Sequence, residues 1–506
     1  MRTKNSFKTI VYGVIMTGLI ALVGLFKTKI LLEYIGEDSV AIYQLFAQIY
    51  TYLSLVDGGM TSAMIYYLYK PIRDKNYEEI SEKINGVSSY FRNIGFLIII
   101  IGLILSINIM FFVKQSSLSP MYIRICFIIF IIASACSYFA SSHAVLYEAE
   151  QKLYKSSNLN HGLNLIKGIV EILLVINGFD LLTLMFSFLI LSILKNIILI
   201  IISKKDHKYL VKTNKKNKDF KKEANSLFVQ KISSLVFENI DVFLLSKFTN
   251  SISVVIYTVY YQITHMITLM IKRVNSAIIP SIGDMLLDTN KEHARNLFDE
   301  INALLFYIAF IVCIPLYFAL NPFINLWYGE KYVSSNLIAL LFVLILFITI
   351  ISIVLDSYIR ASGNFKSIKY WSIYQSVINL ILSFLLVNKY GMLGVLSATV
   401  ISFITGNFIS YPYVVSKKIL ERKQYIYYKN CLIYLLILIL VIPLCYYVGT
   451  LLSYKNLIHW LLSSLIIFVI NFVLVTGYFY LTKNLMFLKR FKYLLRSKKC
   501  DINKSR

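Results

Sequence analysis

Hydrophobic residues occur along most of this chain in runs of roughly 20, separated by short polar segments. An α-helix of that length crosses the roughly 30 Å hydrocarbon layer of a membrane. The pattern therefore predicts an all-α polytopic membrane protein with about 14 transmembrane helices. The predicted spans are residues 9–33, 40–68, 89–113, 120–146, 157–177, 180–203, 223–247, 251–279, 299–320, 334–360, 367–388, 391–416, 430–452 and 456–481.

Lysine and arginine are distributed unevenly over the predicted connections. If the N-terminus lies in the cytoplasm, the cytoplasmic segments hold 39 of these residues and the outer loops hold six. This is the bias that the positive-inside rule describes, and a miscounted span would scramble it. The sequence therefore predicts cytoplasmic termini at both ends. The net charge of +25 reflects this topology, with some attraction to anionic lipid, rather than binding to nucleic acid.

Composition agrees with a membrane protein. Hydrophobic residues make up 58% of the chain and charged residues only 15%, whereas a soluble protein has ~45–50% apolar residues. The six cysteines and six histidines are scattered without the spacing of a metal site. We therefore expect no disulfide, metal or resident cofactor.

The chain contains an internal repeat. Residues 39–49 and residues 253–263 are identical at six of eleven positions, at an offset of 214, and further matches occur at an offset of 212. Each half has an even number of predicted spans, so the halves are expected to run in the same direction, as parallel repeats do. The predicted segments are two six-helix bundles (1–203 and 223–416), a cytoplasmic lysine-rich linker (204–222), two additional transmembrane helices (417–481) and a basic cytoplasmic tail (482–506).

Several segments resemble one family of transporters. Residues 29–38 resemble the first-loop signature of the polysaccharide (Wzx-type) flippases, although Ala41 stands where family members often have glycine. Residues 360–366, 375–383 and 389–399 resemble that family's segment from the tenth to the twelfth helix, with its cytoplasmic Gly turn and Gly-x-x-Gly entry.

This resemblance implies the fold of the multidrug/oligosaccharidyl-lipid/polysaccharide (MOP) exporters, to which MATE transporters also belong. It implies a flippase that moves a polyprenyl-pyrophosphate-linked oligosaccharide from the cytoplasmic to the outer leaflet by alternating access, for surface polysaccharide biosynthesis. The expected location is the bacterial cytoplasmic (inner) membrane. Membrane lipid and other polysaccharide assembly proteins are candidate partners. Fourteen spans are also similar to the lipid II flippases.

Polar side chains inside the predicted spans recur at helical spacing. A charged residue in the bilayer costs ~2.5–3.5 kcal/mol on insertion scales, so such residues usually face a partner or a wet cavity. Cations in a central cleft would replace the water that a pyrophosphate loses. The candidates for substrate binding are Lys27, Lys29, Asn164, Lys167, Lys231, Tyr261, His265, Lys272 and Arg273. The candidates for ion coupling, with H⁺ or Na⁺, or for counter-charge are Asp57, Glu171, Glu238 and Asp241.

Simpler interpretations of these residues stay open at this point. Lys167 and Glu171, four residues apart, could satisfy each other on one helix. Lys29 could extend to the outer interface, and Lys272 and Arg273 could anchor the cytoplasmic end of a span.

Two other functions are alternatives to a flippase. A small-molecule antiporter of the same fold would favour carboxylates over lysines in its cavity, because its substrates are commonly cations. A membrane glycosyltransferase or polymerase would need an extended outer loop with catalytic groups, whereas every predicted outer loop is short. We therefore expect a transporter and no enzyme activity.

Overall fold

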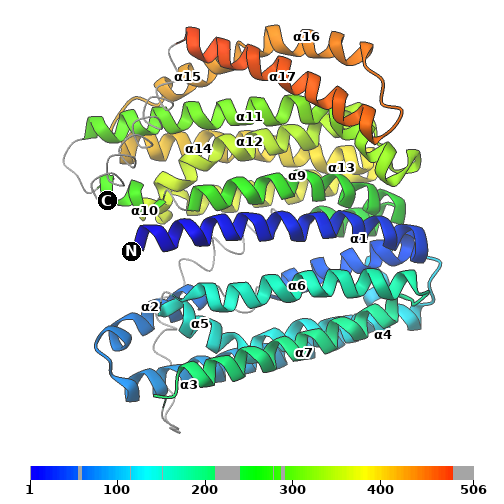
Figure 1. The fold of residues 1–506 in the computed structure, drawn as a ribbon, viewed down its shortest axis with the longest axis vertical. Coiled ribbons are helices and arrows are strands. Elements are labelled where there is room, and N and C mark those ends of the chain that lie inside the picture. The colour runs from blue at the N-terminus through cyan, green and yellow to red at the C-terminus, as the bar shows by residue number, and fades with distance from the viewer. Residues whose placement is uncertain are drawn as a thin grey trace, which may run out of the picture. The chain divides into compact units, whose positions relative to one another are not determined.

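The computed structural model describes residues 2–54, 60–113, 116–150, 152–210, 240–276, 279–286 and 291–482. These residues are almost entirely helical and include no strand, which confirms the predicted all-α class (Figure 1). Eleven helical runs among them are long and apolar enough to cross a membrane. The predicted number of 14 spans stays a prediction, because most of the span at residues 223–247 lies outside the described residues.

The chain forms two compact units. Unit 1 comprises residues 1–262 and 376–398, and unit 2 comprises residues 263–375 and 399–506. The predicted bounds of the bundles, linker and tail stay a prediction. Unit 1 holds α1 (Arg2–Leu53), α2 (Met60–Arg73), α3 (Tyr77–Ile107), α4 (Pro120–Ala135), α5 (Ser141–Ala149), α6 (Leu153–Ile176) and α7 (Leu181–Asp206).

Unit 2 is built around one long helix. Here α11 (Lys291–Tyr328) packs against both α12 (Asn336–Ala361) and α17 (Leu457–Leu481), and α16 (Leu438–Leu451) packs against α17. The helices α9 (Ser251–Ser276) and α13 (Phe365–Thr405) contribute residues to both units. Among the described residues, the other helices of unit 2 are α10 (Ile279–Leu286), η5 (Glu330–Tyr332), α14 (Asn407–Tyr413), η6 (Val414–Ile419) and α15 (Tyr425–Leu435).

Glycine joins two pairs of predicted spans without a loop. Within α1 the helix breaks at Gly36, whose φ is 78°, and within α13 it breaks at Gly391, whose φ is 54°. A side chain is strained at such positive φ values, whereas glycine adopts them freely. Gly36 falls between the predicted spans 9–33 and 40–68, and Gly391 is the first residue of the predicted span 391–416.

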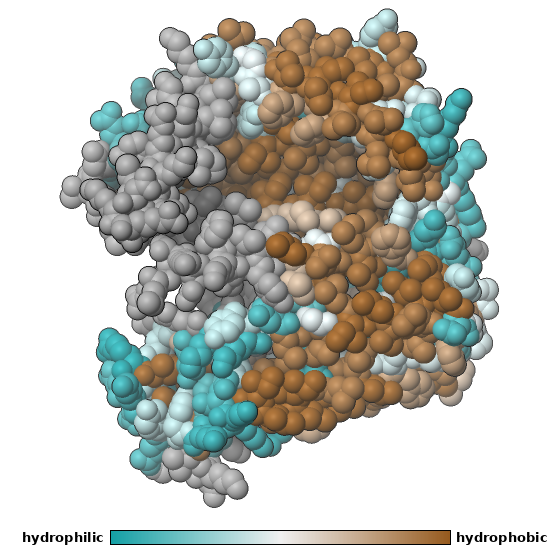
Figure 2. All heavy atoms as spheres, in the orientation of Figure 1, coloured by the Kyte–Doolittle hydropathy of each residue, from teal (hydrophilic) through white to brown (hydrophobic). Residues whose placement is uncertain are grey.

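Large apolar side chains face outward from many of these helices. Figure 2 shows hydrophobic surface over α16 and α17, where Leu461 and Leu465 are more than half exposed. The outer face of α7 is similar, with Ile190 and Ile201. An apolar exterior over whole helices is what lipid requires, so the protein is a multi-pass membrane protein.

Candidate functional site

Charged side chains of α1 and α6 meet inside unit 1. The Lys27 ammonium donates a hydrogen bond of 2.8 Å to Glu171 Oε2, and the Glu171 side chain is only 1% exposed. The Lys167 ammonium lies 3.7 Å from Glu171 Oε1. One carboxylate is therefore shared by two lysines that are 140 positions apart in the sequence.

Aromatic rings complete this site. The Tyr43 hydroxyl donates to Glu171 Oε1 at 3.3 Å and accepts a hydrogen bond of 3.2 Å from Lys167. The Lys167 ammonium also lies 3.5 Å from the centre of the Phe188 ring, a cation–π contact. These contacts stabilise the ammonium groups in an apolar region without supplying a second negative charge.

A third lysine adds to the positive charge. Lys195 of α7 lies close enough to Lys167 for the two charges to repel each other. Lys195 forms no ion pair within the described part of the chain. We call Lys27, Tyr43, Lys167, Glu171 and Lys195 the lysine cluster. It holds three cations and one carboxylate.

Close packing of α1 on α6 brings the cluster together. A Cβ atom on Gly168 would lie 2.7 Å from Val23 Cγ1, closer than real Cβ contacts. The missing side chain therefore lets the two helices approach, and it places Lys27 within reach of Glu171. A Cβ atom added to Gly162 on the same helix would meet no atom within 4 Å. Of these two glycines, only Gly168 therefore allows the close approach of α1 and α6.

A buried carboxyl group lies elsewhere in unit 1. Asp241 is 5% exposed, and its Oδ2 accepts a hydrogen bond of 2.9 Å from the Tyr257 hydroxyl. Its Oδ1 is buried without a hydrogen-bond partner in the described part of the chain. The Tyr257 ring stacks on the ring of Tyr261, a predicted substrate-binding residue, with 5.7 Å between the ring centres.

The other predicted residues are dispersed. Lys29 lies 3.8 Å from Glu33 in an i,i+4 pair, and Asn164 is exposed on α6. His265 and Lys272 belong to unit 2. Arg273 lies on α9, but its side chain is outside the described residues, as are Asp57, Lys231 and Glu238 altogether. The role of all these residues in transport stays a prediction.

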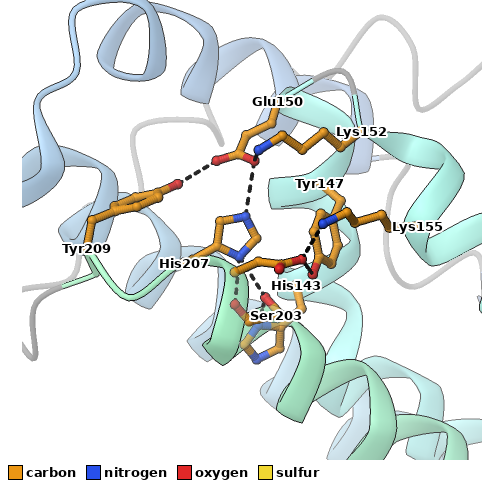
Figure 3. Close-up of polar contacts among 9 residues, drawn as sticks. His143, Tyr147, Glu150, Lys152, Lys155, Ser203, His207 and Tyr209 are labelled. Carbon is orange, nitrogen blue, oxygen red and sulfur yellow. Dashed lines mark hydrogen bonds and ion pairs between the residues drawn. The ribbon is translucent and has the colours of Figure 1, made fainter. Parts of the chain in front are cut away.

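A second polar group, which no sequence pattern indicated, lies in unit 1 where the end of α5 meets the end of α7 (Figure 3). Glu150 accepts hydrogen bonds from Lys152 at 2.8 Å and from Tyr209 at 2.5 Å, and it faces His207 Nε2 at 3.1 Å. Nearby, the Asp206 carboxylate is bound by Tyr147 at 2.7 Å. We call this the Glu150 network; its members are His143, Tyr147, Glu150, Lys152, Lys155, Ser203, Asp206, His207 and Tyr209.

Electrostatics explain why Glu150 stays ionised. Burial alone raises the pKa of its carboxyl group. The hydrogen bonds from Lys152 and Tyr209 and the nearby His207 outweigh burial and hold that pKa below its usual value. The network fastens the turn after α5 to the residues that follow α7.

The family follows from comparison with known proteins. A family model described as "Polysaccharide biosynthesis protein" matches residues 4–286, more than half of the chain. The chain belongs to this family. Comparison with the sequences of curated proteins gives no match.

Solved structures support the same fold. The lipid II flippase MurJ in an inward closed conformation is similar with a TM-score of 0.69 and 18% identity, over 92% of this chain and 98% of MurJ. An inward-facing MATE multidrug resistance transporter of the MOP superfamily is similar with a TM-score of 0.63 and 14% identity, over 79% and 93% of the two chains. The predicted MOP fold is thus confirmed. Family and fold together make the chain a member of the polysaccharide biosynthesis family with the fold that MurJ and the MATE transporters share.

Proposed function

We propose that the protein is a flippase that moves a polyprenyl-pyrophosphate-linked oligosaccharide from the cytoplasmic to the outer leaflet of the bacterial cytoplasmic membrane by alternating access. The observation that carries this proposal is the charge surplus of the lysine cluster. Lys27 and Lys167 share the single carboxylate of Glu171, and Lys195 has no carboxylate of its own in the described chain. A pyrophosphate entering this region would supply the missing negative charge.

The same surplus weighs against the rival function. A MATE-like antiporter that exports cations would be expected to present carboxylates without enough partners. In the lysine cluster the opposite holds, because cations outnumber carboxylates. Family membership in polysaccharide biosynthesis favours the lipid-linked substrate as well.

The full-length protein in proteoliposomes tests the proposal. The probe is a fluorescent undecaprenyl-pyrophosphate-linked disaccharide, whose accessibility to a membrane-impermeant quencher reports its crossing. Lys167→Gln should slow the crossing by about tenfold or more. The matched control is Lys389→Gln, which removes an exposed lysine beside Tyr390 and should leave the rate unchanged.

Two results would count against the proposal. The first is an unchanged rate in Lys167→Gln when the variant is folded and inserted. The second is faster transport of a cationic dye than of the lipid-linked probe, which would favour the antiporter.

The proposal includes a coupling ion. A returning H⁺ or Na⁺ would bind at Asp241, since this carboxyl group is buried and its Oδ1 lacks a hydrogen-bond partner in the described chain. Asp241→Asn keeps the shape and the Tyr257 contact but cannot exchange a proton. Crossing of the probe should then lose its dependence on an imposed pH or Na⁺ gradient. A gradient response equal to that of the unaltered protein would remove Asp241 from the mechanism.

A further inference from the structure

A pocket of about 670 Å³ opens in unit 2, where α11 ends and α12 begins. Its wall combines the last turns of α11, the connection through η5, the end of α16 and the segment that leads to α17. Pockets of roughly 300–1,000 Å³ are typical of sites for small molecules. We call it the α11–α12 pocket.

Four of its polar side chains have their hydrogen-bonding capacity available. Asn325, Glu330, Tyr446 and Tyr454 line the pocket, and none of them forms a side-chain hydrogen bond or ion pair with the described part of the chain. Burial raises the pKa of Tyr454, so its hydroxyl stays a donor at neutral pH. Among the described lining residues Glu330 alone is charged, and none is Lys, Arg or His.

Other bonds hold the wall of the pocket in place. The Asn321 amide donates to the Ser334 carbonyl oxygen at 3.2 Å and to Asn336 Oδ1 at 2.9 Å, which fixes the connection before α12. The Trp460 indole donates to the Ala319 carbonyl oxygen at 3.0 Å, which fixes α17 against α11. The pocket is therefore formed before any ligand binds, and binding does not have to order its walls.

The two ends of α11 differ in charge. Its beginning carries Lys291 and Arg295, and Arg422 binds Asp299 there through two hydrogen bonds of 2.8 and 2.9 Å. The pocket lies at the other end of the same helix. By the positive-inside rule the basic end faces the cytoplasm, so the pocket faces the outer side.

We propose that the α11–α12 pocket binds uncharged sugar residues on the outer side of the membrane. Amides, tyrosine hydroxyls and a carboxylate exchange hydrogen bonds with sugar hydroxyls, and tyrosine rings pack on the apolar faces of sugar rings. A phosphate is a poor ligand here, because Glu330 would repel it and no described lining residue is cationic. This assignment rests on the pocket alone and holds whether or not the lysine cluster moves a pyrophosphate.

Saturation-transfer NMR on the full-length protein in nanodiscs tests the proposal. The probes are N,N′-diacetylchitobiose, lactose and maltotriose, with inorganic pyrophosphate as competitor. Gly449 lines the pocket, and its Cβ would lie 3.4 Å from Phe318, so Gly449→Leu should fill the space and weaken sugar binding by about tenfold or more. The matched control is Gly477→Leu on α17, where a Cβ meets nothing within 4 Å.

Binding of at least one sugar that is lost in Gly449→Leu, kept in Gly477→Leu and unaffected by pyrophosphate supports the proposal. Absence of transfer from all three sugars, or displacement by pyrophosphate, would overturn it. Asn325→Leu provides a second variant in case Gly449→Leu fails to fold, and unchanged sugar binding in that variant also counts against the pocket.

A further probe distinguishes a lipid-linked sugar from a free glycan as the ligand of the pocket. If chitobiose carried on geranyl pyrophosphate binds more tightly than free chitobiose, and Gly449→Leu abolishes both, the ligand is the glycan part of a lipid-linked sugar. If the two bind equally, the pocket takes a free glycan. Either result supports sugar binding at this pocket.

Discussion

Unit 1 has a group of charged side chains where α1 and α6 pack together, and unit 2 has, in the α11–α12 pocket, polar side chains without protein partners in the described chain. In the lysine cluster every charge but that of Lys195 is held by a partner, because an isolated ion in an apolar region is costly. In the α11–α12 pocket Asn325 and Glu330 need no protein partner, because water reaches them. Most charges of the lysine cluster are thus met by protein partners, whereas Asn325 and Glu330 stay available to a ligand.

The largest expected effect comes from removing the shared carboxylate. Glu171→Leu leaves Lys27 and Lys167 without a counter-charge, and breaking a buried ion pair in this way costs about 3–5 kcal/mol of the free energy of unfolding. The midpoint of thermal unfolding in detergent should fall accordingly. In the triple variant Lys27→Met, Lys167→Met and Glu171→Leu most of that stability should return, because no unpaired charge from these three residues remains. A triple variant as unstable as Glu171→Leu would show that the cluster is held by packing and not by charge.

The close contact of α1 and α6 gives the next effect. Gly168→Ala introduces a Cβ that collides with Val23, and overpacking of this kind costs about 1–3 kcal/mol. Gly162→Ala on the same helix meets nothing and should be neutral or stabilising by up to about 1 kcal/mol, since alanine favours helices. The difference between the two unfolding midpoints is the measurement. Equal midpoints would mean that the helices separate easily and that the cluster does not depend on their approach.

A smaller effect is expected in the wall of the pocket. Asn321→Ala removes the hydrogen bonds to Ser334 and Asn336, which should cost about 1 kcal/mol. Hydrogen–deuterium exchange should rise in residues 330–336 and stay unchanged in α6. Protection of residues 330–336 equal to that in the unaltered protein would show that the connection is ordered by other contacts.

The smallest effect concerns the Glu150 network. This network is partly exposed, so its burial is intermediate between that of the lysine cluster and that of the α11–α12 pocket. The pKa of Glu150 is lowered in the folded protein. Its stabilising contribution is therefore present above the ordinary glutamate pKa of about 4.3 and is lost as the pH falls through the lowered value. Acidification should increase exchange in residues 204–210, after correction for the intrinsic pH dependence. In Glu150→Gln this increase should already be present at neutral pH, and a variant that still shows the full pH response would assign it to another group.

The fold could be predicted from the sequence because a membrane allows few kinds of spanning structure. Lipid requires long apolar helices, so their positions and their class are visible in the hydrophobic pattern. The positive φ of Gly36 and Gly391 was not visible in that pattern, although the boundary between spans was. The resemblance carried by residues 29–38 and 360–399 then indicated the family, and the family model matches residues 4–286.

The candidate site was predicted only in part. Helical spacing placed Lys167 and Glu171 on one face of α6, and both belong to the cluster. The sequence could not show that Lys27 of α1 takes the shorter bond, because that depends on how two distant helices pack. Lys195 was overlooked although it lies in an apolar run, and the same insertion cost would have identified it. The pocket has no local signal, since its lining comes from segments more than a hundred residues apart.

The glycine breaks at Gly36 and Gly391 have a practical consequence for mapping sidedness. Each joins two helices with no spare residues, so a reporter or epitope inserted there would have to unwind a helix end before any antibody could reach it. Exposed positions in true connections, such as Lys455 between α16 and α17, can carry a cysteine for labelling with little disturbance. Labelling of such a cysteine in intact cells would report directly which face of the membrane this part of unit 2 occupies.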